Sequence, residues 1–331
     1  MIIIAGNSRS GTTMTGRILG NHPAVFTFQE LHFFDELSSH SKLFENCDHR
    51  LLVTLYAKLL ARQRNGYFGN NATRPFMDEA EKMIVLHNCK NLSEVYKTFL
   101  TEESKRFDKS IPCEQTPQNL FALDALFKIF PDAKVVLMVR DPREVLLSQK
   151  NKWKRRTFTS EKFPLSESIR AALNYHPVTI SKIWHASANA IIKHSRDKRI
   201  LVVRFEDLIG DADKTIRAIC SHCRLEFNAN MLKIPFAGSS NVNDAPGTLG
   251  IDSSRTGKWE NGLSKTEIAI CQKINGPLMT QWGYDQAATG TTFLWLTLYY
   301  ISMPVKLILS LPFNIKRLKN PGRIWRSLTG N

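Results

Sequence analysis

The first twenty residues restrict the fold more than any other part of the chain. An apolar run at residues 2–5 predicts a buried β-strand, residues 6–12 form a glycine-containing loop, and residues 13–19 predict a helix that stops at Gly20 and Pro23. A strand that enters a helix through such a loop is typical of parallel α/β folds. We therefore expect an α/β protein whose first strand belongs to the core.

Later segments extend this pattern. Apolar runs at 134–139 and 200–204 predict buried parallel strands, because they show no polar alternation. Residues 228–255 are rich in Gly, Ser, Asn and Pro and predict a long functional or mobile loop. Helices are predicted at 51–63, 92–105, 120–130, 143–152, 169–194 with a break at Pro177, and 215–225.

The loop G-N-S-R-S-G-T-T at residues 6–13 nearly matches the nucleotide-binding P-loop G-x-x-x-x-G-K-[ST]. Backbone N–H groups of such a loop and of the following helix bind phosphate oxygens. Thr12 stands in the position of the lysine that contacts ATP phosphates, and no downstream carboxylate is an evident magnesium ligand. This loop suits a 5′-phosphosulfate, with Arg9 near the bridging oxygen. The alternative is an ordinary strand–helix turn with a charged tip.

At four separated places the sequence resembles the PAPS-dependent sulfotransferase superfamily, in particular its bacterial-type and Golgi-type members, the heparan and tyrosylprotein sulfotransferases. PAPS is 3′-phosphoadenosine 5′-phosphosulfate. The first place is the loop, whose implied contacts to the 5′-phosphosulfate are Ser8, Arg9, Ser10, Gly11, Thr12 and Thr13. The second place is V-R-D-P-R-E-V-L-L-S, residues 139–148, in which the resemblance implies that Arg140 and Ser148 bind the 3′-phosphate. A salt bridge with Glu144 is the alternative role for Arg140.

The third and fourth places concern the acceptor. Glu30 begins the segment E-L-H-F-F-D and stands where the Golgi-type enzymes carry their catalytic glutamate. The resemblance therefore implies that Glu30 is the general base and His32 a helper that orients acceptor or donor. C-E-Q-T-P resembles the E-K-T-P segment, with Gln115 in place of the usual lysine and Glu114 as the competing base. Alternatively, Glu30 is a solvated loop carboxylate and His32 a packing residue.

Two later segments add to the resemblance. V-R-F-E-D-L resembles a strand end of the family, with Phe205 in place of a tyrosine that often meets the nucleotide. R-T-G-K-W resembles the loop that closes over the donor. The resemblance implies phosphate contacts from Arg255 and Lys258, and a lid or core anchor at Trp259.

The resemblance spans residues 1–285 and implies a P-loop NTPase-like α/β fold, with a mostly parallel sheet flanked by helices and with helical insertions. It implies in-line transfer of a sulfuryl group from PAPS, an anionic nucleotide donor, to a hydroxyl or amine of a carbohydrate, glycolipid or similar acceptor, without a metal. Two other functions stay open. One is a P-loop kinase or phosphotransferase that uses a nucleoside triphosphate, and the other is an inactive nucleotide-binding, membrane-associated protein. The acceptor's identity and the oligomeric state are not predicted.

The 331 residues carry a formal net charge of +15. Six positive residues and no acidic ones follow Asp285, which leaves about +9 on the body, as suits an anionic small ligand. The sequence contains no recognisable nucleic-acid-binding motif, so we expect no nucleic-acid partner. Cys220 and Cys223 form a C-x-x-C without a second ligand pair at zinc spacing. Their helical segment predicts core positions for both.

Residues 293–313 are apolar enough to meet a bilayer, and the tail that follows them is basic. A basic tail and a domain that uses a cytosolic donor belong on the same side of a membrane. We therefore expect residues 286–331 to follow the 1–285 domain as a segment that lies in an anionic membrane surface, through 293–326, rather than crossing it. The competing interpretation is a helical pair packed on the domain or on a partner. The start of the chain does not resemble a signal peptide, so we expect a cytoplasmic protein at the inner face of the membrane.

Overall fold

The computed structural model describes residues 1–36, 40–66, 72–154, 164–235, 249–251 and 256–314, and these contain a five-stranded sheet whose paired strands are all parallel. The strand order is β2-β3-β1-β4-β5. The predicted α/β fold class is therefore confirmed. The strands are β1 Ile2–Gly6, β2 Val25–Thr27, β3 Ile111–Glu114, β4 Lys134–Val139 and β5 Ile200–Arg204.

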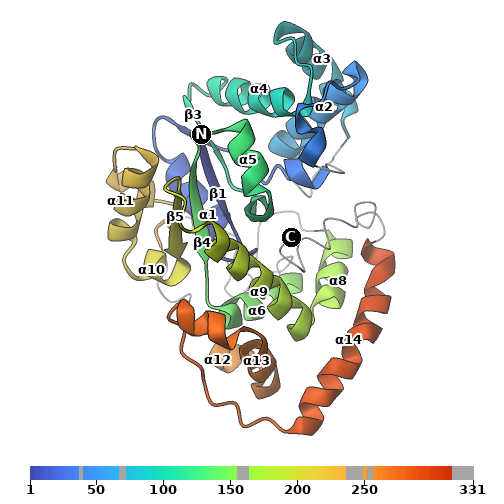
Figure 1. Cartoon of the computed structure of the whole chain (residues 1–331), viewed down its shortest axis with the longest axis vertical. Helices are drawn as coiled ribbons and strands as arrows, with labels where there is room; N and C mark the ends of the chain where they lie inside the picture. Colours follow the sequence, from blue (N-terminus) through green and yellow to red (C-terminus); the bar gives the residue numbers. More distant parts are fainter. Residues whose placement is uncertain (37–39, 67–71, 155–163, 236–248, 252–255, 315–331) are drawn as a thin grey trace.

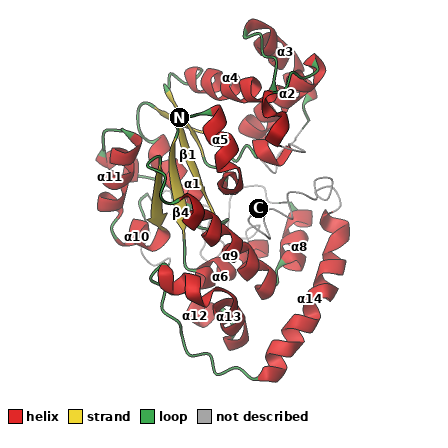
Figure 2. Ribbon diagram, in the orientation of Figure 1, coloured by secondary structure: helices red, strands yellow, loops and turns green. Residues whose placement is uncertain are grey.

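Helices flank the sheet and extend beyond it (Figure 1, Figure 2). Helices α2, α3 and α4 gather at one end of the molecule and α12 and α13 lie at the other, from which α14 runs along one side (Figure 1). The helices are α1 Thr12–Gly20, α2 His49–Asn65, α3 Met77–Leu86, α4 Leu92–Lys105, α5 Leu123–Ile129, α6 Pro142–Lys150, α8 Leu165–Asn174, α9 Pro177–His194, α10 Phe205–Gly210, α11 Ala212–Cys223, α12 Trp259–Gly262, α13 Lys265–Gln281 and α14 Phe293–Asn314.

Alternate residues of β1 serve the two faces of the sheet, as the pleat of a strand requires. Ile3 and Ala5 pack in a core with buried residues of α2, α4, α5 and α9. Ile2 and Ile4 pack on the other face with buried residues of α1 and α11. A strand buried on both faces has no polar alternation, which explains its continuous apolar run.

The strand register gathers several chain segments at one edge of the sheet. Gly6 of β1 pairs with Met138 of β4, and Val139 of β4 pairs with Arg204 of β5. The loop after Gly6 therefore starts next to the residues that follow Val139 and Arg204. Ligands of α/β proteins bind in crevices at the carboxyl ends of parallel strands, so this edge is the place to look for the site.

Most predicted elements are present, although one is shorter and several others were not predicted. The predicted strands at 134–139 and 200–204 match β4 and β5, and the predicted break at Pro177 separates α8 from α9. The helix predicted at 120–130 is shorter, because a 3-10 turn (η4, Pro117–Ala122) precedes α5. No sequence pattern predicted β2 and β3, since strands of three and four residues are too short to show periodicity. Helices α3, α10, α12 and α13 were also not predicted.

The buried face of α11 consists of Ile216, Ile219, Cys220 and Cys223. All four belong to the core cluster that covers Ile2 and Ile4 of β1. The prediction that both cysteines of the C-x-x-C are core residues is therefore confirmed.

Helix α14 lies along the outside of the molecule beside α8 (Figure 1, Figure 2). It has 22 residues and a stretch of mean hydropathy 1.5, long and apolar enough to cross a membrane by length and composition alone. Its large apolar side chains are mostly exposed, with Ile301 at 62% and Ile308 at 65%. Polar contacts hold it to the α8–α9 junction: Lys306 Nζ donates to the Tyr175 carbonyl oxygen at 3.0 Å, and His176 Nε2 lies 3.0 Å from the carbonyl oxygen of Tyr299.

Candidate functional site

The loop between β1 and α1 is fixed by its two glycines. Gly6 has a φ angle of 149° and Gly11 one of 94°. A Cβ atom on Gly6 would lie 2.3 Å from the carbonyl oxygen of Met138, and one on Gly11 would lie 2.5 Å from the ring of Phe205. Only glycine permits this packing together with these angles. The loop is therefore held against the ends of β4 and β5.

Groups that bind anions cluster where this loop becomes α1. The first N–H groups of a helix have no acceptor within the helix, and the helix dipole favours negative charge there. Ser10 is fully buried, and its Oγ has no hydrogen-bond partner among the described residues. A buried hydroxyl of this kind fits a phosphate or sulfuryl oxygen. The expected contacts Ser8, Arg9, Ser10, Gly11, Thr12 and Thr13 all lie in this loop and the first turn of α1.

Arg140 and Ser148 lie against the same loop. Arg140 directly follows β4, and Ser148 is buried in α6. Arg9 Nε donates a hydrogen bond to Ser148 Oγ at 2.9 Å, and Arg140 Nη1 donates to the Arg9 carbonyl oxygen at 3.2 Å. The two motifs expected to hold the two ends of a nucleotide therefore adjoin. The expected role of Arg9 is a contact to the bridging oxygen of the donor. In the structure its side chain also contacts Ser148, in the motif expected to bind the 3′-phosphate.

Arg140 has two further partners. Its Nη2 pairs with Glu144 Oε2 at 3.1 Å, and its guanidinium lies over the ring of Phe205 at 4.2 Å from the centroid. The salt bridge considered as an alternative role thus exists beside the contact to the loop. Burial lowers the pKa of Arg140, against the opposing charge of Glu144. Phe205 contributes to the site as the platform for this arginine.

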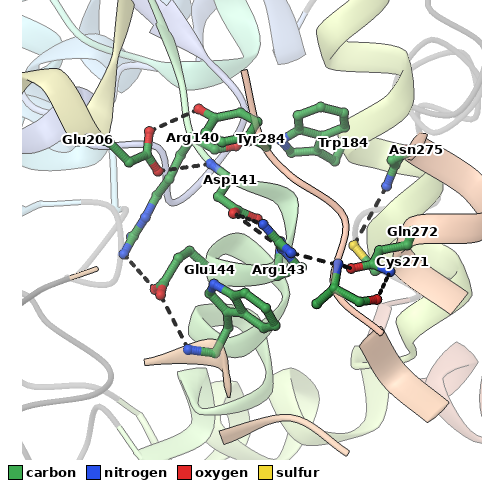
Figure 3. A network of polar contacts seen from close by, with 12 residues as sticks. Arg140, Asp141, Arg143, Glu144, Trp184, Glu206, Cys271, Gln272, Asn275 and Tyr284 are labelled. Carbon is green, nitrogen blue, oxygen red and sulfur yellow. Dashed lines mark hydrogen bonds and ion pairs between the residues drawn. The ribbon is translucent and has the colours of Figure 1, made fainter. Parts of the chain in front are cut away.

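A network of polar contacts braces the backbone at Arg140 (Figure 3). Arg143 donates two hydrogen bonds to the Asp141 carboxylate, from Nε at 3.0 Å and from Nη2 at 2.6 Å. Glu206 accepts a hydrogen bond from the Asp141 backbone N–H at 3.0 Å, and Trp184 Nε1 donates to the Arg140 carbonyl oxygen at 2.9 Å. Both contacts hold the peptide group that joins Arg140 to Asp141, and this restricts the direction of the Arg140 side chain.

Glu30, His32 and Asp35 form a cluster in which an imidazole lies between two carboxylates. His32 Nε2 is 3.2 Å from Glu30 Oε2, and His32 Nδ1 is 2.7 Å from Asp35 Oδ2. Burial by itself lowers the pKa of His32, but hydrogen bonds to Asp35 and Glu30 raise it above its ordinary value. The backbone of His32 has a φ angle of 51°, and strained residues of this kind cluster at functional sites.

Glu30 has the properties of an ionised, accessible carboxylate. Its side chain is 35% exposed. Burial acts to raise its pKa, but the hydrogen bond and charge of His32, followed by the charges of Lys152 and Arg9, bring the pKa below its ordinary value. A general base needs to be deprotonated and within reach of the substrate, and Glu30 meets both requirements.

Lys152 is a site residue that sequence reasoning missed. It lies in a 3-10 turn (η5, Lys152–Lys154) directly after α6, and its charge acts on Glu30. Its charge helps to keep Glu30 ionised. In the sequence Lys152 stands among other Lys and Arg residues and far from Glu30, so no local pattern distinguishes it.

Glu114, the competing base, is fully buried at the end of β3. Its carboxylate accepts hydrogen bonds from the backbone N–H of Thr116 at 3.1 Å and of Leu31 at 3.4 Å, and from the side chains of Thr116 and Asn119. Burial raises the pKa of Glu114 to about 7. Glu114 thus links the segment after β3, through Thr116, to Leu31, the residue that follows Glu30.

Gln115 is buried beside α1. A Cβ atom added to Gly16 of α1 would lie 3.3 Å from Cβ of Gln115, so the two segments are in close contact. The Oε1 atom of Gln115 is buried without a hydrogen-bond partner among the described residues. Its amide therefore has bonding capacity left for a ligand near the start of α1.

The segment expected to close over the donor is only partly described. Arg255 lies outside the described residues, and Lys258 is a partly exposed residue just before α12. Trp259 is 9% exposed, with the guanidinium of Arg143 stacked on its ring at 3.9 Å, and its backbone N–H donates to Glu144 Oε1 at 3.3 Å. Trp259 is thus a core anchor beside the Arg140 site.

These features define a class. The first strand of a parallel α/β sheet leads into a P-loop-like loop without the Walker lysine. The neighbouring strand of the sheet, β4, is followed by the buried Arg140, which lies beside this loop. This combination is typical of a nucleotide-dependent group-transfer enzyme. The model of the sulfotransferase family matches residues 2–229. The chain therefore belongs to the sulfotransferase family.

Two solved structures share the fold. The sulfotransferase domain from the curacin biosynthetic pathway is 17% identical, with 87% of this chain and 98% of that chain covered and a TM-score of 0.55. The sulfotransferase domain from the Synechococcus PCC 7002 olefin synthase is 19% identical, with 87% and 95% covered and a TM-score of 0.54. At these identities the similarity shows a common fold.

Proposed function

We propose that this sulfotransferase takes its sulfuryl group from PAPS and passes it to a hydroxyl or amine of a carbohydrate, glycolipid or lipid-linked acceptor. One observation carries the donor assignment. The anion-binding loop and the Arg140–Ser148 pair adjoin through Arg9, which bonds to Ser148 by its side chain and to Arg140 by its carbonyl oxygen. A single site with two adjoining anion subsites matches a nucleotide with phosphate groups at both its 3′ and 5′ positions.

In the proposed reaction Glu30 accepts the proton of the acceptor group as that group attacks the sulfur. The bond between sulfur and the bridging oxygen breaks, and its electron pair leaves with adenosine 3′,5′-bisphosphate. Loop N–H groups and Arg9 stabilise the charge that develops on the leaving phosphate. His32, held between Glu30 and Asp35, orients the base. Gln115 and Lys152 supply polar contacts to the sulfuryl group.

The rival function is phosphoryl transfer from a nucleoside triphosphate. Thr12 replaces the lysine on which P-loop enzymes rely for the β- and γ-phosphates, and the buried Arg140 beside the loop supplies a cation suited to a 3′-phosphate, which ATP lacks. Calorimetry decides between the two: adenosine 3′,5′-bisphosphate should bind and ATP with magnesium should not. Transfer of label from ³⁵S-PAPS to an acceptor mixture then separates an active enzyme from an inactive nucleotide-binding protein.

We further propose that the enzyme works at the inner surface of a membrane. The support comes from α14, which exposes most of its apolar side chains while polar contacts tie it to the α8–α9 junction. An exposed apolar helix followed by a basic segment is the composition of an interfacial anchor on anionic lipids. An enzyme held in this position has direct access to glycolipid or lipid-linked acceptors.

A further inference from the structure

Glu144 is a buried carboxylate within the donor site that the proposed reaction does not use. It lies in the first turn of α6 and is 1% exposed. Its two oxygens have different partners (Figure 3): Oε2 pairs with Arg140 Nη2 at 3.1 Å, and Oε1 accepts the backbone N–H of Trp259 at 3.3 Å. Burial raises the pKa of Glu144, and Arg140 opposes that shift.

A phosphate that binds Arg140 has to use N–H groups of a guanidinium that already contacts Arg9 and Glu144. Its Nη1 donates to the carbonyl oxygen of Arg9, and its Nη2 faces Glu144. An arginine binds phosphate through paired N–H groups on one side of its fork. Both forks of an arginine include Nη2, so a 3′-phosphate bound by a fork of Arg140 shares the Nη2 group with Glu144 and lies next to its carboxylate.

Movement of the Glu144 carboxylate away from a phosphate bound at Arg140 is restricted. The Trp259 N–H holds one oxygen, and the side chain lacks a route to solvent at 1% exposure. A second buried acid, Glu206, is placed differently, because its oxygens hold the Asp141 N–H at 3.0 Å and the Tyr284 hydroxyl at 2.9 Å. Glu206 braces the strand end, whereas Glu144 contacts the guanidinium itself.

We propose that Glu144 is a specificity-determining residue that competes with the nucleotide 3′-phosphate for Arg140, and so limits how tightly the site holds adenosine 3′,5′-bisphosphate. This inference rests on the proposed donor. Like charges held close together in a buried site repel strongly. The competition weakens binding of the product that has to leave after each transfer, and it acts only on nucleotides that carry a 3′-phosphate.

The test is Glu144→Gln, which removes the charge while an amide oxygen can still accept the Trp259 N–H. Calorimetry measures the dissociation constants of adenosine 3′,5′-bisphosphate and of adenosine 5′-monophosphate, which has no 3′-phosphate. We expect the variant to bind the bisphosphate about tenfold more tightly, as one like charge is removed from a partly buried site, and the monophosphate within about twofold of wild type. The matched control is Glu260→Gln, which removes an exposed carboxylate of α12 and should change neither constant.

If the preference for the bisphosphate over the monophosphate is unchanged in Glu144→Gln, the inference is overturned. A lower preference overturns it too and shows that Glu144 orients Arg140 instead. If that variant does not fold, Glu144→Asp provides the same decision. Aspartate is too short to reach Arg140 and Trp259 together, so the preference should rise by less than expected for Gln, and a preference at or below that of wild type refutes the competition. A wild-type protein that binds both nucleotides equally overturns the donor assignment itself, which is a distinguishable failure.

Discussion

Two carboxylates approach the segment around His32 by different routes. Glu30 contacts the His32 imidazole at 3.2 Å, whereas Glu114 is bonded to the backbone of the neighbouring Leu31. Glu30 is partly exposed, while Glu114 is surrounded by donors from its own segment. An acceptor hydroxyl can meet Glu30 without displacing protein atoms. At the scale of single residues we therefore assign proton transfer to Glu30 and support of the loop to Glu114.

Glu30→Gln should lower turnover by about 10²–10⁴, the usual contribution of general acid–base catalysis, with donor affinity nearly unchanged. Gln keeps the shape and hydrogen-bonding capacity of the side chain but cannot accept the acceptor's proton. The residues that we propose hold the donor, the loop with Arg140 and Ser148, are left in place by this substitution. Steady-state kinetics with labelled PAPS and calorimetry with the bisphosphate measure the two effects separately.

The comparison variant is Glu114→Gln, which should lose much less turnover than Glu30→Gln. If Glu114→Gln abolishes turnover while Glu30→Gln stays within about threefold of wild type, the two roles are reversed. The assignment of the chain to the sulfotransferases does not depend on this outcome, but the assignment of the base does.

Glu114 also predicts a pH dependence of stability. Its pKa is raised from an ordinary value of 4.5 to about 7 by burial, so the folded state favours the protonated carboxyl. Its contribution is fully present below pH 4.5 and is lost as the pH rises through about 7. The free energy of unfolding should fall over this interval by up to about 3 kcal/mol.

Urea denaturation at pH 5 and pH 8 measures this loss. In Glu114→Gln, which does not titrate, the same change of pH should alter the unfolding free energy by less. If the unfolding free energy changes equally between pH 5 and pH 8 in the two proteins, Glu114 is ionised in the folded state at both pH values and the prediction is wrong.

At the scale of elements, the turn from β4 into α6 joins Arg140 and Ser148, the two residues that we propose bind the 3′-phosphate of the donor. Asp141 caps α6 by accepting the backbone N–H of Arg143 at 2.8 Å, and Pro142 begins the helix. This cap places Arg140 and Ser148 on the side of the anion loop. The sequence pattern of a buried strand, Asp-Pro and a helix was strong enough to predict this turn.

Arg140→Ala should weaken binding of adenosine 3′,5′-bisphosphate by about 2–4 kcal/mol, the range for removing one partner of a buried charged pair. Affinity for adenosine 5′-monophosphate should fall less, because the loop that holds the 5′-phosphate is retained. Calorimetry with both nucleotides checks the prediction. Bisphosphate affinity equal to that of wild type would mean that another residue holds the 3′-phosphate.

Helix α14 predicts a membrane-binding surface. Replacing Ile301 and Ile308 by Glu should reduce co-sedimentation with anionic vesicles several-fold, since both side chains are exposed and a charge on the apolar face opposes burial in lipid. The melting temperature should change little, because neither residue is part of the core.

A matched control lies on α3, at the other end of the molecule (Figure 1). Val85 and Leu86 are 63% and 72% exposed, and replacing both by Glu introduces the same charges away from α14. Equal loss of vesicle binding in the two double variants would argue against α14 as the contact surface.

At the scale of the whole molecule, the segment 286–331 should be separable from the domain that precedes it. Deletion of residues 290–331 is expected to leave a folded protein that binds the bisphosphate but does not sediment with anionic vesicles, because the large apolar side chains of α14 are mostly exposed and do not belong to the core. Circular dichroism and calorimetry test the fold and the site. A deletion variant that does not fold would make α14 part of the core.

Sequence alone predicted the sheet's long strands and the anion loop, because each is a continuous local pattern. It did not predict which distant segments meet. The contact of Arg9 with Ser148 and the influence of Lys152 on Glu30 depend on strand order, which no local pattern encodes. The resemblance of R-T-G-K-W to a donor-covering loop indicated that this segment returns to the donor motifs, but it gave no sign that the Trp259 N–H bonds to Glu144.

The position of β1 also has a consequence for how the chain matures. β1 lies in the middle of the sheet, yet Ile2 pairs with Cys113 of β3 and with Lys134 of β4. A ribosome therefore has to deliver more than a third of the chain before the first strand finds either neighbour, and pairing across such sequence distances is slow. Until then the I-I-I-A run is an unpaired apolar strand, open to aggregation or to chaperones. Substitutions in β4 should thus lower the yield of folded protein in a cell by more than their effect on equilibrium stability explains.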